Sequence, residues 1–239
     1  MTTTRGSGIL SAVLAEHERS GAPLPDILVD MCARSLPVSG VGMALMTDDG
    51  PAGTVAATDG SALELEDLQF SLGEGPCVDA SQSGRPVLQP DLGQTGDQRW
   101  PVFAAGAAAA GLAAVFAFPL RVGGIRLGVL DLYRTTAGAL AEAELTHALT
   151  FADAATAVLL HLQAHAAGLE PPLDSLTVLD DRAEVHQATG IVSVQAAVPL
   201  QEALLLLRAR AYAEQRPIGT LAQDVLDGVV DFNGALDSG

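Results

Sequence analysis

The chain contains no lysine, so all twelve of its Lys and Arg positions are arginines. A P-loop phosphate site, a pyridoxal Schiff base and a phospho-acceptor receiver site each require a lysine amine, and the sequence excludes all three. Positive charge is scarce as well, because 29 acidic residues leave a formal net charge of -17. Non-specific affinity for double-stranded DNA comes from neutralising phosphates, so we expect no duplex DNA partner.

Cysteine is almost as scarce, since only Cys32 and Cys77 are present. Two cysteines cannot form a disulfide scaffold, and they are typical of a reducing cytoplasm, where we expect this protein. Cys77 follows "GEGP" at a predicted helix start, a position that stabilises a thiolate. Three interpretations of Cys77 remain open: a buried structural residue, a redox sensor and an enzyme nucleophile. The enzyme would need a second, resolving cysteine, and Cys32 lies in no motif that marks it as one.

Metal-binding and catalytic patterns are sparse. His161 and His165 are spaced i, i+4 on a predicted helix, but no HExxH motif or Cys/His cluster accompanies them. The sequence also lacks a GxSxG nucleophile motif, a glycine-rich dinucleotide turn and a carboxylate pair that can be placed in one cleft. We therefore expect neither an enzyme nor a metal site.

One uncharged run needs a membrane test. Residues 100–120 carry no charge and approach the roughly 20 residues that a spanning helix needs. The run nevertheless contains Pro101, Gly106, Gly111 and Pro119. We predict an alanine-rich helix that ends at Gly111 and a strand over 112–120, with no membrane span.

Apolar residues are abundant, at 49% of the chain, and they provide enough material for a buried core. Their spacing predicts an α+β fold in which helices flank a largely antiparallel sheet. The tight turn Gly123-Gly124 joins the last two strands. The predicted helices cover 9–19, 24–36, 61–72 and 140–165, and the predicted strands cover 40–47, 54–59, 85–92, 112–122 and 125–134.

A composition change separates two domains. The segment "AAGLEPPLDSL" (166–176) contains two prolines that cannot continue a helix, so it is the expected linker between domains 1–165 and 177–239. The second domain is helical in pattern throughout. Its three predicted helices run over 177–195, 199–216 and 218–231.

The first domain contains "SLGEGPCVDASQSGRPV" (71–87) and the closing strand pair "FPLRVGGIRLGVLDLY" (118–133). With the order of its elements, these segments resemble a GAF domain, the small-molecule sensing fold of many bacterial signalling proteins. The resemblance implies an internal pocket for an unidentified small-molecule ligand. Gly73 and Gly75 would let the backbone approach the pocket rim, and the next helix would offer free amides to an anion. We therefore assign ligand or redox sensing to Gly73, Gly75 and Cys77; a thiol enzyme resembling the GAF-fold methionine sulfoxide reductases is the enzymatic alternative.

The second domain contains "RAEVHQATGIVSVQAAVPLQEALLLLRARAYAEQRPIGTLAQDVL" (182–226). This segment resembles an ANTAR domain, the three-helix RNA-binding output module of bacterial antiterminators. The resemblance implies a transcript leader with RNA hairpins as the partner, and it covers Ala188, Gly190, Ile191, Ala203, Leu207, Arg208, Ala211, Leu221 and Ala222. Glycine inside a helix costs about 1 kcal/mol relative to alanine, so we predict that another helix lies close to Gly190.

Arginines gather on the second helix of this domain. At 100° per residue from Leu200, Arg208, Tyr212 and Arg216 fall at about 80°, 120° and 160°, beside an apolar stripe that includes Leu207. Two guanidinium groups around an aromatic ring suit phosphates and an unstacked base of looped RNA. Arg210 falls on the other side of the stripe, next to Glu214. We expect RNA contacts from Arg208, Tyr212 and Arg216, extended by Arg182 and Thr189 on the polar face of the preceding helix.

The acidic composition of the second domain leaves open a function without RNA binding. From Asp174 onward ten acids face four arginines, a formal balance of -6, and arginines beside an apolar stripe often only cover the core with their stems. The expected function is a signal-responsive regulator that binds RNA and promotes transcription antitermination, with the helix over 140–165 as a route for homodimerisation and signalling. Protein–protein signalling, or ligand or redox sensing without RNA, is the alternative.

Overall fold

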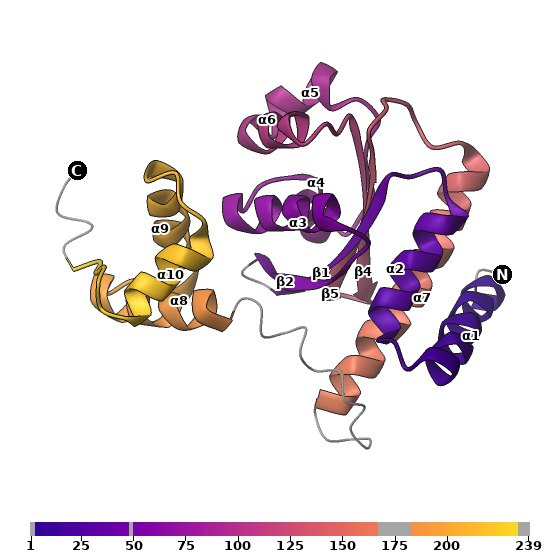
Figure 1. Ribbon diagram of the computed structural model, residues 1–239, viewed down its shortest axis with the longest axis horizontal. Coiled ribbons are helices and arrows are strands. Elements are labelled where there is room, and N and C mark those ends of the chain that lie inside the picture. Colours follow the sequence, from indigo (N-terminus) through magenta and orange to yellow (C-terminus); the bar gives the residue numbers. More distant parts are fainter. Residues whose placement is uncertain (1–2, 48–49, 167–182, 234–239) are drawn as a thin grey trace.

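The computed structural model describes residues 3–47, 50–166 and 183–233. Its centre is a five-stranded sheet in the order β2-β1-β5-β4-β3, in which every neighbouring pair is antiparallel (Figure 1). The strands are β1 (Gly40–Thr47), β2 (Gly50–Ala57), β3 (Val87–Gln89), β4 (Ala114–Val122) and β5 (Ile125–Arg134). The predicted hairpin of 112–122 and 125–134 is therefore present, with Gly123 in the left-handed region at φ 59°.

Helices α2 (Leu24–Ser35) and α7 (Glu142–Ala166) cover one face of the sheet, and α1 (Thr3–Ser20) packs on these two helices on the side away from the strands (Figure 1). Strand side chains of one parity, such as Met43 and Leu132, pack with Leu28 of α2 and Phe151 of α7 in a single buried cluster. Strand side chains alternate between the two faces, and helices cover both faces. For this reason β1 and β5 are apolar along almost their whole length.

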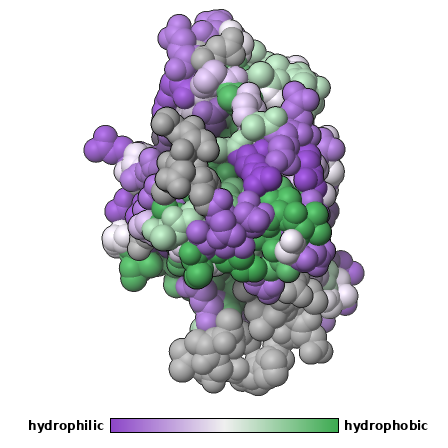
Figure 2. All heavy atoms as spheres, turned by 90° about the vertical axis from the view of Figure 1, so that its left-hand side faces the viewer, coloured by the Kyte–Doolittle hydropathy of each residue, from purple (hydrophilic) through white to green (hydrophobic). Residues whose placement is uncertain are grey.

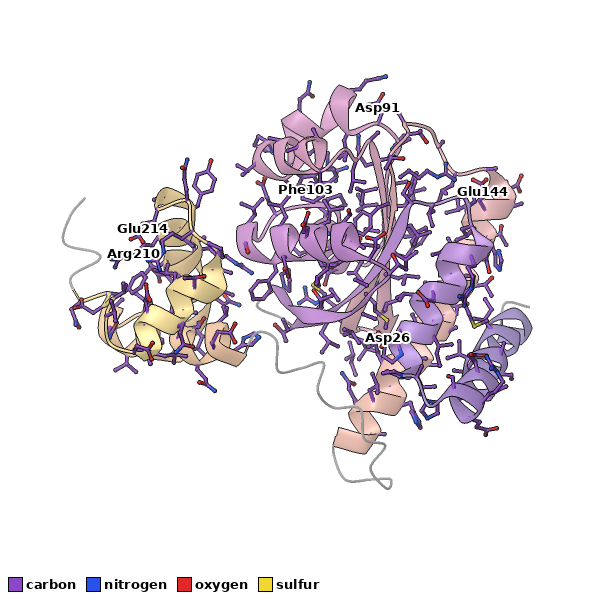
Figure 3. All side chains as sticks on the ribbon, in the orientation of Figure 1. Asp26, Asp91, Phe103, Glu144, Arg210 and Glu214 are labelled. Carbon is purple, nitrogen blue, oxygen red and sulfur yellow. The ribbon has the colours of Figure 1, made fainter. Side chains whose placement is uncertain are left out.

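Four helices cover the other face: α3 (Gly60–Leu72), α4 (Pro76–Ser83), α5 (Leu92–Arg99) and α6 (Pro101–Ala109). Trp100, Phe103 and Tyr133 are fully buried between these helices and the sheet; Figure 3 shows Phe103 in this layer. The expected α+β architecture of a sheet with flanking helices is confirmed for this part of the chain.

The uncharged run over 100–120 forms α6 and β4, as predicted, and both contribute to the core. Among the described residues, α7 is long and apolar enough to cross a membrane by length and composition alone. Helices α8 and α9 together pass the same test, with a bend of 104° between them. One face of α7 packs on α1, α2 and the sheet, as the core helix of a layered domain does.

Two local expectations differ from the structure. β2 begins at Gly50, within the predicted turn, because register irregularities opposite Met43/Ala44 and Leu45/Met46 accommodate a longer hairpin. The expected strand over 85–92 is shorter in the structure: β3 ends at Gln89, and α5 begins at Leu92, where the Asp91 carboxylate accepts from the Gly93 amide at 3.0 Å. Pro90 follows β3 directly, and a proline has no amide to donate to a strand ladder.

The C-terminal helices are α8 (Ala183–Ala196), α9 (Leu200–Ala213) and α10 (Ile218–Leu226). They share a buried cluster that includes Val192, Leu207, Leu221 and Phe232. Helix α10 ends five residues before its predicted limit at 231, and Gly228 follows in the left-handed region at φ 71°. The expected linker over 166–176, apart from its first residue, and the expected helical residues 177–182 lie outside the described residues.

The prediction for Gly190 is wrong. A Cβ atom added there would meet no atom of the described residues within 4 Å, so none of the described helices approaches closely at this position. The close packing of the three helices instead uses the fully buried small residues Ala188, Ala203 and Ala222.

Candidate functional site

The C-terminal helices dock on α3 and on the β1–β2 hairpin. Phe70 of α3 is 1% exposed and belongs to the same buried cluster as the residues of α8, α9 and α10. Its ring meets the edge of His186 at 6.3 Å between centroids, and His186 Nε2 lies 2.7 Å from the Ala52 carbonyl oxygen of β2. The core of the C-terminal helices is therefore completed by a side chain of the sheet-containing part.

Arg208 lies at the centre of this junction. Its guanidinium carbon is 5.5 Å from the centre of the Phe70 ring, within the range of a cation–π contact. Its Nη1 atom lies over Gly73, where an added Cβ would come within 2.6 Å of it. The Nε and Nη2 atoms are buried. The predicted RNA contact is therefore covered by α3 in this arrangement.

The structure brings Arg208, Tyr212 and Arg216 together around one hollow of about 640 Å³. The opposite wall of this hollow includes Ser71 and Leu72, at the end of α3. Tyr212 is 62% exposed at this hollow. Figure 2 shows the side of the molecule that carries the C-terminal helices, where hydrophobic and hydrophilic side chains are mixed.

Arg216 is held by carboxylates of the same chain. Its Nη2 donates to Asp224 Oδ2 at 2.5 Å, and its Nη1 donates to Glu214 Oε2 at 3.3 Å. Hydrogen bonding to Asp224, more than the nearby charges, raises the pKa of Arg216. Part of the positive charge of the predicted ridge is therefore offset before any ligand arrives.

Arg210 lies away from the hollow, as the helical spacing predicts. Its Nε donates to Glu214 Oε1 at 2.8 Å, and the two side chains lie together in Figure 3. The guanidinium also covers Phe232 at 5.1 Å. The hydrogen bond from Arg210 is the main cause that lowers the pKa of Glu214.

One of the two residues that we expected to extend this site along α8, Thr189, is buried in the structure. Thr189 is 6% exposed, and its hydroxyl donates to the Val185 carbonyl oxygen at 2.7 Å. The hydroxyl thus bonds back to its own helix inside the cluster, and it offers no surface to RNA. Arg182 lies outside the described residues.

The glycine loop after α3 is tied to the rest of the fold. Gly73 and Gly75 have φ values of 65° and 134°, which L-residues rarely adopt, so the backbone conformation of this loop favours glycine at both positions. The Cys77 amide, at the start of α4, donates to Gln69 Oε1 at 2.9 Å. The amides of Val102 and Phe103, at the start of α6, donate to Glu74 Oε1. At the helix start where we expected free amides for an anion, the Cys77 amide is therefore already engaged by Gln69.

Cys77 is 1% exposed and lies on the α3–α6 side of the sheet. Cys32 lies in the other core layer, and burial raises the pKa of its thiol to about 12. The sheet separates the two sulfur atoms, so Cys32 is not placed as a resolving partner. The burial of Cys77 agrees with the structural interpretation, and its roles as redox sensor or nucleophile stay predictions.

A buried polar cluster, which the sequence analysis missed, lies between α3 and β5. Glu66, Gln69, Asp131 and Tyr133 are each at most 2% exposed, and the Tyr133 hydroxyl donates to Glu66 Oε1. Gly42 of β1 faces Glu66, and a Cβ there would collide with the carboxylate. Burial first, and then the charge of Glu66, raise the pKa of Asp131 well above its usual range. The sequence feature that could have predicted this cluster is Asp131, an acid inside the apolar strand segment "VLDLY" (129–133).

Beside this cluster lies a hollow of about 150 Å³ lined by Leu65, Leu112 and Tyr133. Among the described residues, no three His, Cys, Asp or Glu side chains are placed to hold a metal ion. Of the histidine pair considered from the sequence, His161 is described, while the side chain of His165 lies outside the described part.

A family model for the GAF domain matches residues 22–159, more than half of the chain. The chain belongs to the GAF domain family. The GAF match covers the whole sheet, the helices α3 to α6 and the buried polar cluster. GAF domains are sensor domains of signalling proteins and typically bind small-molecule ligands.

Solved structures share the fold. One is a domain of a protein described as a two-component sensor histidine kinase from Sinorhizobium meliloti 1021, with a TM-score of 0.50 and 19% identity, covering 60% of this chain and 93% of that chain. Another is the GAF domain of an Acinetobacter phosphoenolpyruvate-protein phosphotransferase, with a TM-score of 0.50 and 17% identity, covering 69% and 98%. A search of curated proteins found no match. The C-terminal helices lie outside the GAF match.

Proposed function

We propose that the chain is a signal-responsive, cytoplasmic RNA-binding regulator. Its C-terminal helices, which resemble an ANTAR domain, bind a hairpin-containing transcript leader and promote transcription antitermination, while the GAF domain senses a small molecule. The single observation that carries the proposal is the ring of Tyr212, which is 62% exposed between Arg208 and Arg216 on the wall of one hollow.

The chemistry of this wall suits an unpaired nucleotide. A planar ring stacks on any base, and guanidinium groups bind phosphates through paired hydrogen bonds. The hollow of about 640 Å³ falls within the range of small-ligand sites, about 300–1,000 Å³. An exposed loop nucleotide, unlike a paired one, can place its base against Tyr212.

The packing of the C-terminal helices supports the resemblance that motivates the proposal. Of the positions that carry it, the following are buried in the cluster of the three helices: Ala188, Ala203, Leu207, Ala211, Leu221 and Ala222.

The α7 helix has exposed Leu149 and Leu160, which support the proposal of a homodimer through this helix.

The test is binding of a fluorescein-labelled hairpin RNA pool with randomised loops to the full chain. Stacking contributes roughly 1–3 kcal/mol per base, so Tyr212→Ala should weaken binding by about 5- to 150-fold. Tyr212→Phe should keep most of the affinity because it keeps the ring. Val194→Ala, which removes an 81% exposed side chain of α8, is the matched control. Equal affinities for Tyr212→Ala and Val194→Ala would contradict the proposal.

A second candidate is protein–protein signalling, and the pairing of Arg216 with Asp224 and Glu214 favours it. A surface whose arginines are already matched by acids attracts phosphates less strongly. This candidate predicts no saturable binding of the hairpin pool by the wild-type chain at any salt concentration.

A further inference from the structure

We propose that the docking of α3 on α9 is an autoinhibitory contact, in which Phe70 and Gly73 hold Arg208 away from RNA. This inference rests on the proposed function and adds its regulation. In the arrangement described above, the RNA-binding wall is incomplete: Tyr212 is exposed, whereas its neighbour Arg208 is engaged by the GAF domain.

The edge of Arg208 that RNA would need is the one that the junction covers. A guanidinium group binds a phosphate most strongly through two parallel hydrogen bonds, and Nε with Nη2 forms one of the two edges that can do so. Both of these atoms are buried. The remaining nitrogen, Nη1, lies against Gly73. Phosphate can therefore reach this arginine fully only after α9 moves away from α3.

Phe70 is the residue that holds the junction closed. It is 1% exposed, although it belongs to a helix of the GAF domain, and its burial is provided by the C-terminal helices. Its ring contacts both the Arg208 guanidinium and the edge of His186. Opening the junction exposes this ring to water, and the free energy of that exposure opposes opening.

The same helix reaches the buried polar cluster of the GAF domain. Glu66 and Gln69 face Asp131 and Tyr133 from one side of α3, and Phe70 faces the C-terminal helices from another. A ligand that displaces Glu66 or Gln69 would therefore move the helix that carries Phe70. This gives the sensor a short physical route to Arg208.

The first experiment compares Phe70→Ala with Leu63→Ala in the full chain. Leu63 lies on the same helix and is 42% exposed, so it controls for changes to α3 itself. If a closed state dominates, apparent affinity is reduced by the fraction of open molecules. We expect Phe70→Ala to bind the randomised-loop hairpin pool at least about tenfold more tightly than wild type. We also expect a larger radius of gyration by small-angle X-ray scattering, with Leu63→Ala unchanged in both.

A second pair of variants tests the inference if Phe70→Ala does not separate α9 from α3. Phe70→Arg places a like charge against Arg208 and forces opening, while Leu63→Arg adds the same charge to α3 away from the junction. Tighter RNA binding by Phe70→Arg than by Leu63→Arg supports autoinhibition only together with a larger radius of gyration of Phe70→Arg, because a new cation beside Arg208 attracts phosphate even in a closed molecule.

The outcomes separate the two proposals. If Phe70 variants expand but bind the hairpin pool no better than a binding-competent wild type, the inference is wrong and the proposed function stands. If they remain compact with wild-type affinity, the contact exerts no control and the inference is again wrong. If the Phe70 variants expand and neither they nor wild type bind RNA, the proposed function fails, and the regulation proposed for it fails with it.

Discussion

Asp131 is a carboxylic acid that is fully buried in the central sheet. It stands at the middle of β5, paired with Gly42 of β1 and Ala117 of β4, and it is fully buried beside Glu66. Two carboxyl groups close together in an apolar layer cannot both ionise at low cost. The raised pKa of Asp131 means that the folded protein retains a proton that the unfolded chain releases.

This proton makes the stability of the GAF domain depend on pH. At pH values below about 4 both states bind the proton, and the contribution of Asp131 is fully present. As pH rises towards the raised pKa, only the unfolded chain loses the proton, so the free energy of unfolding falls, by at most about 1.4 kcal/mol per pH unit. Asp131→Asn should remove this slope, because an amide does not titrate.

Urea unfolding between pH 4.5 and 8, followed by the fluorescence of the single buried Trp100, measures the effect. Asp153→Asn on the exposed face of α7 is the matched control, and it should follow the wild-type slope. Parallel pH profiles for wild type and Asp131→Asn would show that the Asp131 proton does not differ between the folded and unfolded states.

At the scale of elements, α9 gives the clearest test of packing. Leu207 is fully buried in the cluster of the C-terminal helices, whereas Leu205, two residues earlier, is 61% exposed. Large-to-small changes in a core cost about 2–5 kcal/mol, and exposed ones usually stay within about 0.5 kcal/mol. Leu207→Ala should therefore destabilise the C-terminal helices, and Leu205→Ala should not.

Two signals separate this effect from the GAF domain. Far-ultraviolet circular dichroism reports all helices, while Trp100 reports only the GAF core. Leu207→Ala should lower the temperature at which part of the helical signal is lost and leave the Trp100 transition almost unchanged. A common shift of both signals would show instead that the two parts unfold as one unit.

Elements with a strong local pattern were predictable from the sequence. The apolar stripe of α9 places Leu204, Leu207 and Ala211 inside, and all three are buried. The β4–β5 hairpin followed from the Gly123-Gly124 turn. The start of β2 was not predictable, because irregular pairing with β1 decides it. The prediction for Gly190 was wrong for a similar reason. Helix propensity gives the free-energy cost of a glycine in a helix, but it does not show which residues lie next to that glycine.

The candidate site was predictable only in part. Helical spacing correctly placed Arg210 beside Glu214. Arg216 lies beyond the end of α9 at Ala213, after Gln215 with φ 52°, so helical spacing does not account for its place at the hollow with Arg208 and Tyr212. Helical spacing also could not show that α3 covers Arg208, because Phe70 lies far away in the sequence and its contact depends on the docking of two parts. Thr189 was predicted to be exposed because it lies on the polar face of its helix, but it is buried. The sequence of one helix does not show which of its faces other elements cover.

For the whole molecule, the net charge of -17 limits how RNA binding can depend on salt. The described part of the ridge offers at most Arg208 and Arg216, with Arg210 nearby on the other side of α9. Binding of single strands loses about 0.7 in logarithmic slope per neutralised phosphate, so we expect a slope of about -1 to -2. The dissociation constant should then rise only about 4- to 16-fold between 50 and 200 mM salt.

Glu214 provides a sharper version of this prediction, because its carboxylate engages both Arg210 and Arg216. Glu214→Gln should release positive charge at the hollow, tighten binding of the hairpin pool and steepen the salt slope. Glu202→Gln makes the same change in net charge at an exposed position of α9 that lies off the ridge. Fluorescence anisotropy across the salt series decides between them: a steeper slope for Glu214→Gln alone places the phosphate contacts at these arginines, whereas equal slopes attribute RNA binding to the overall charge.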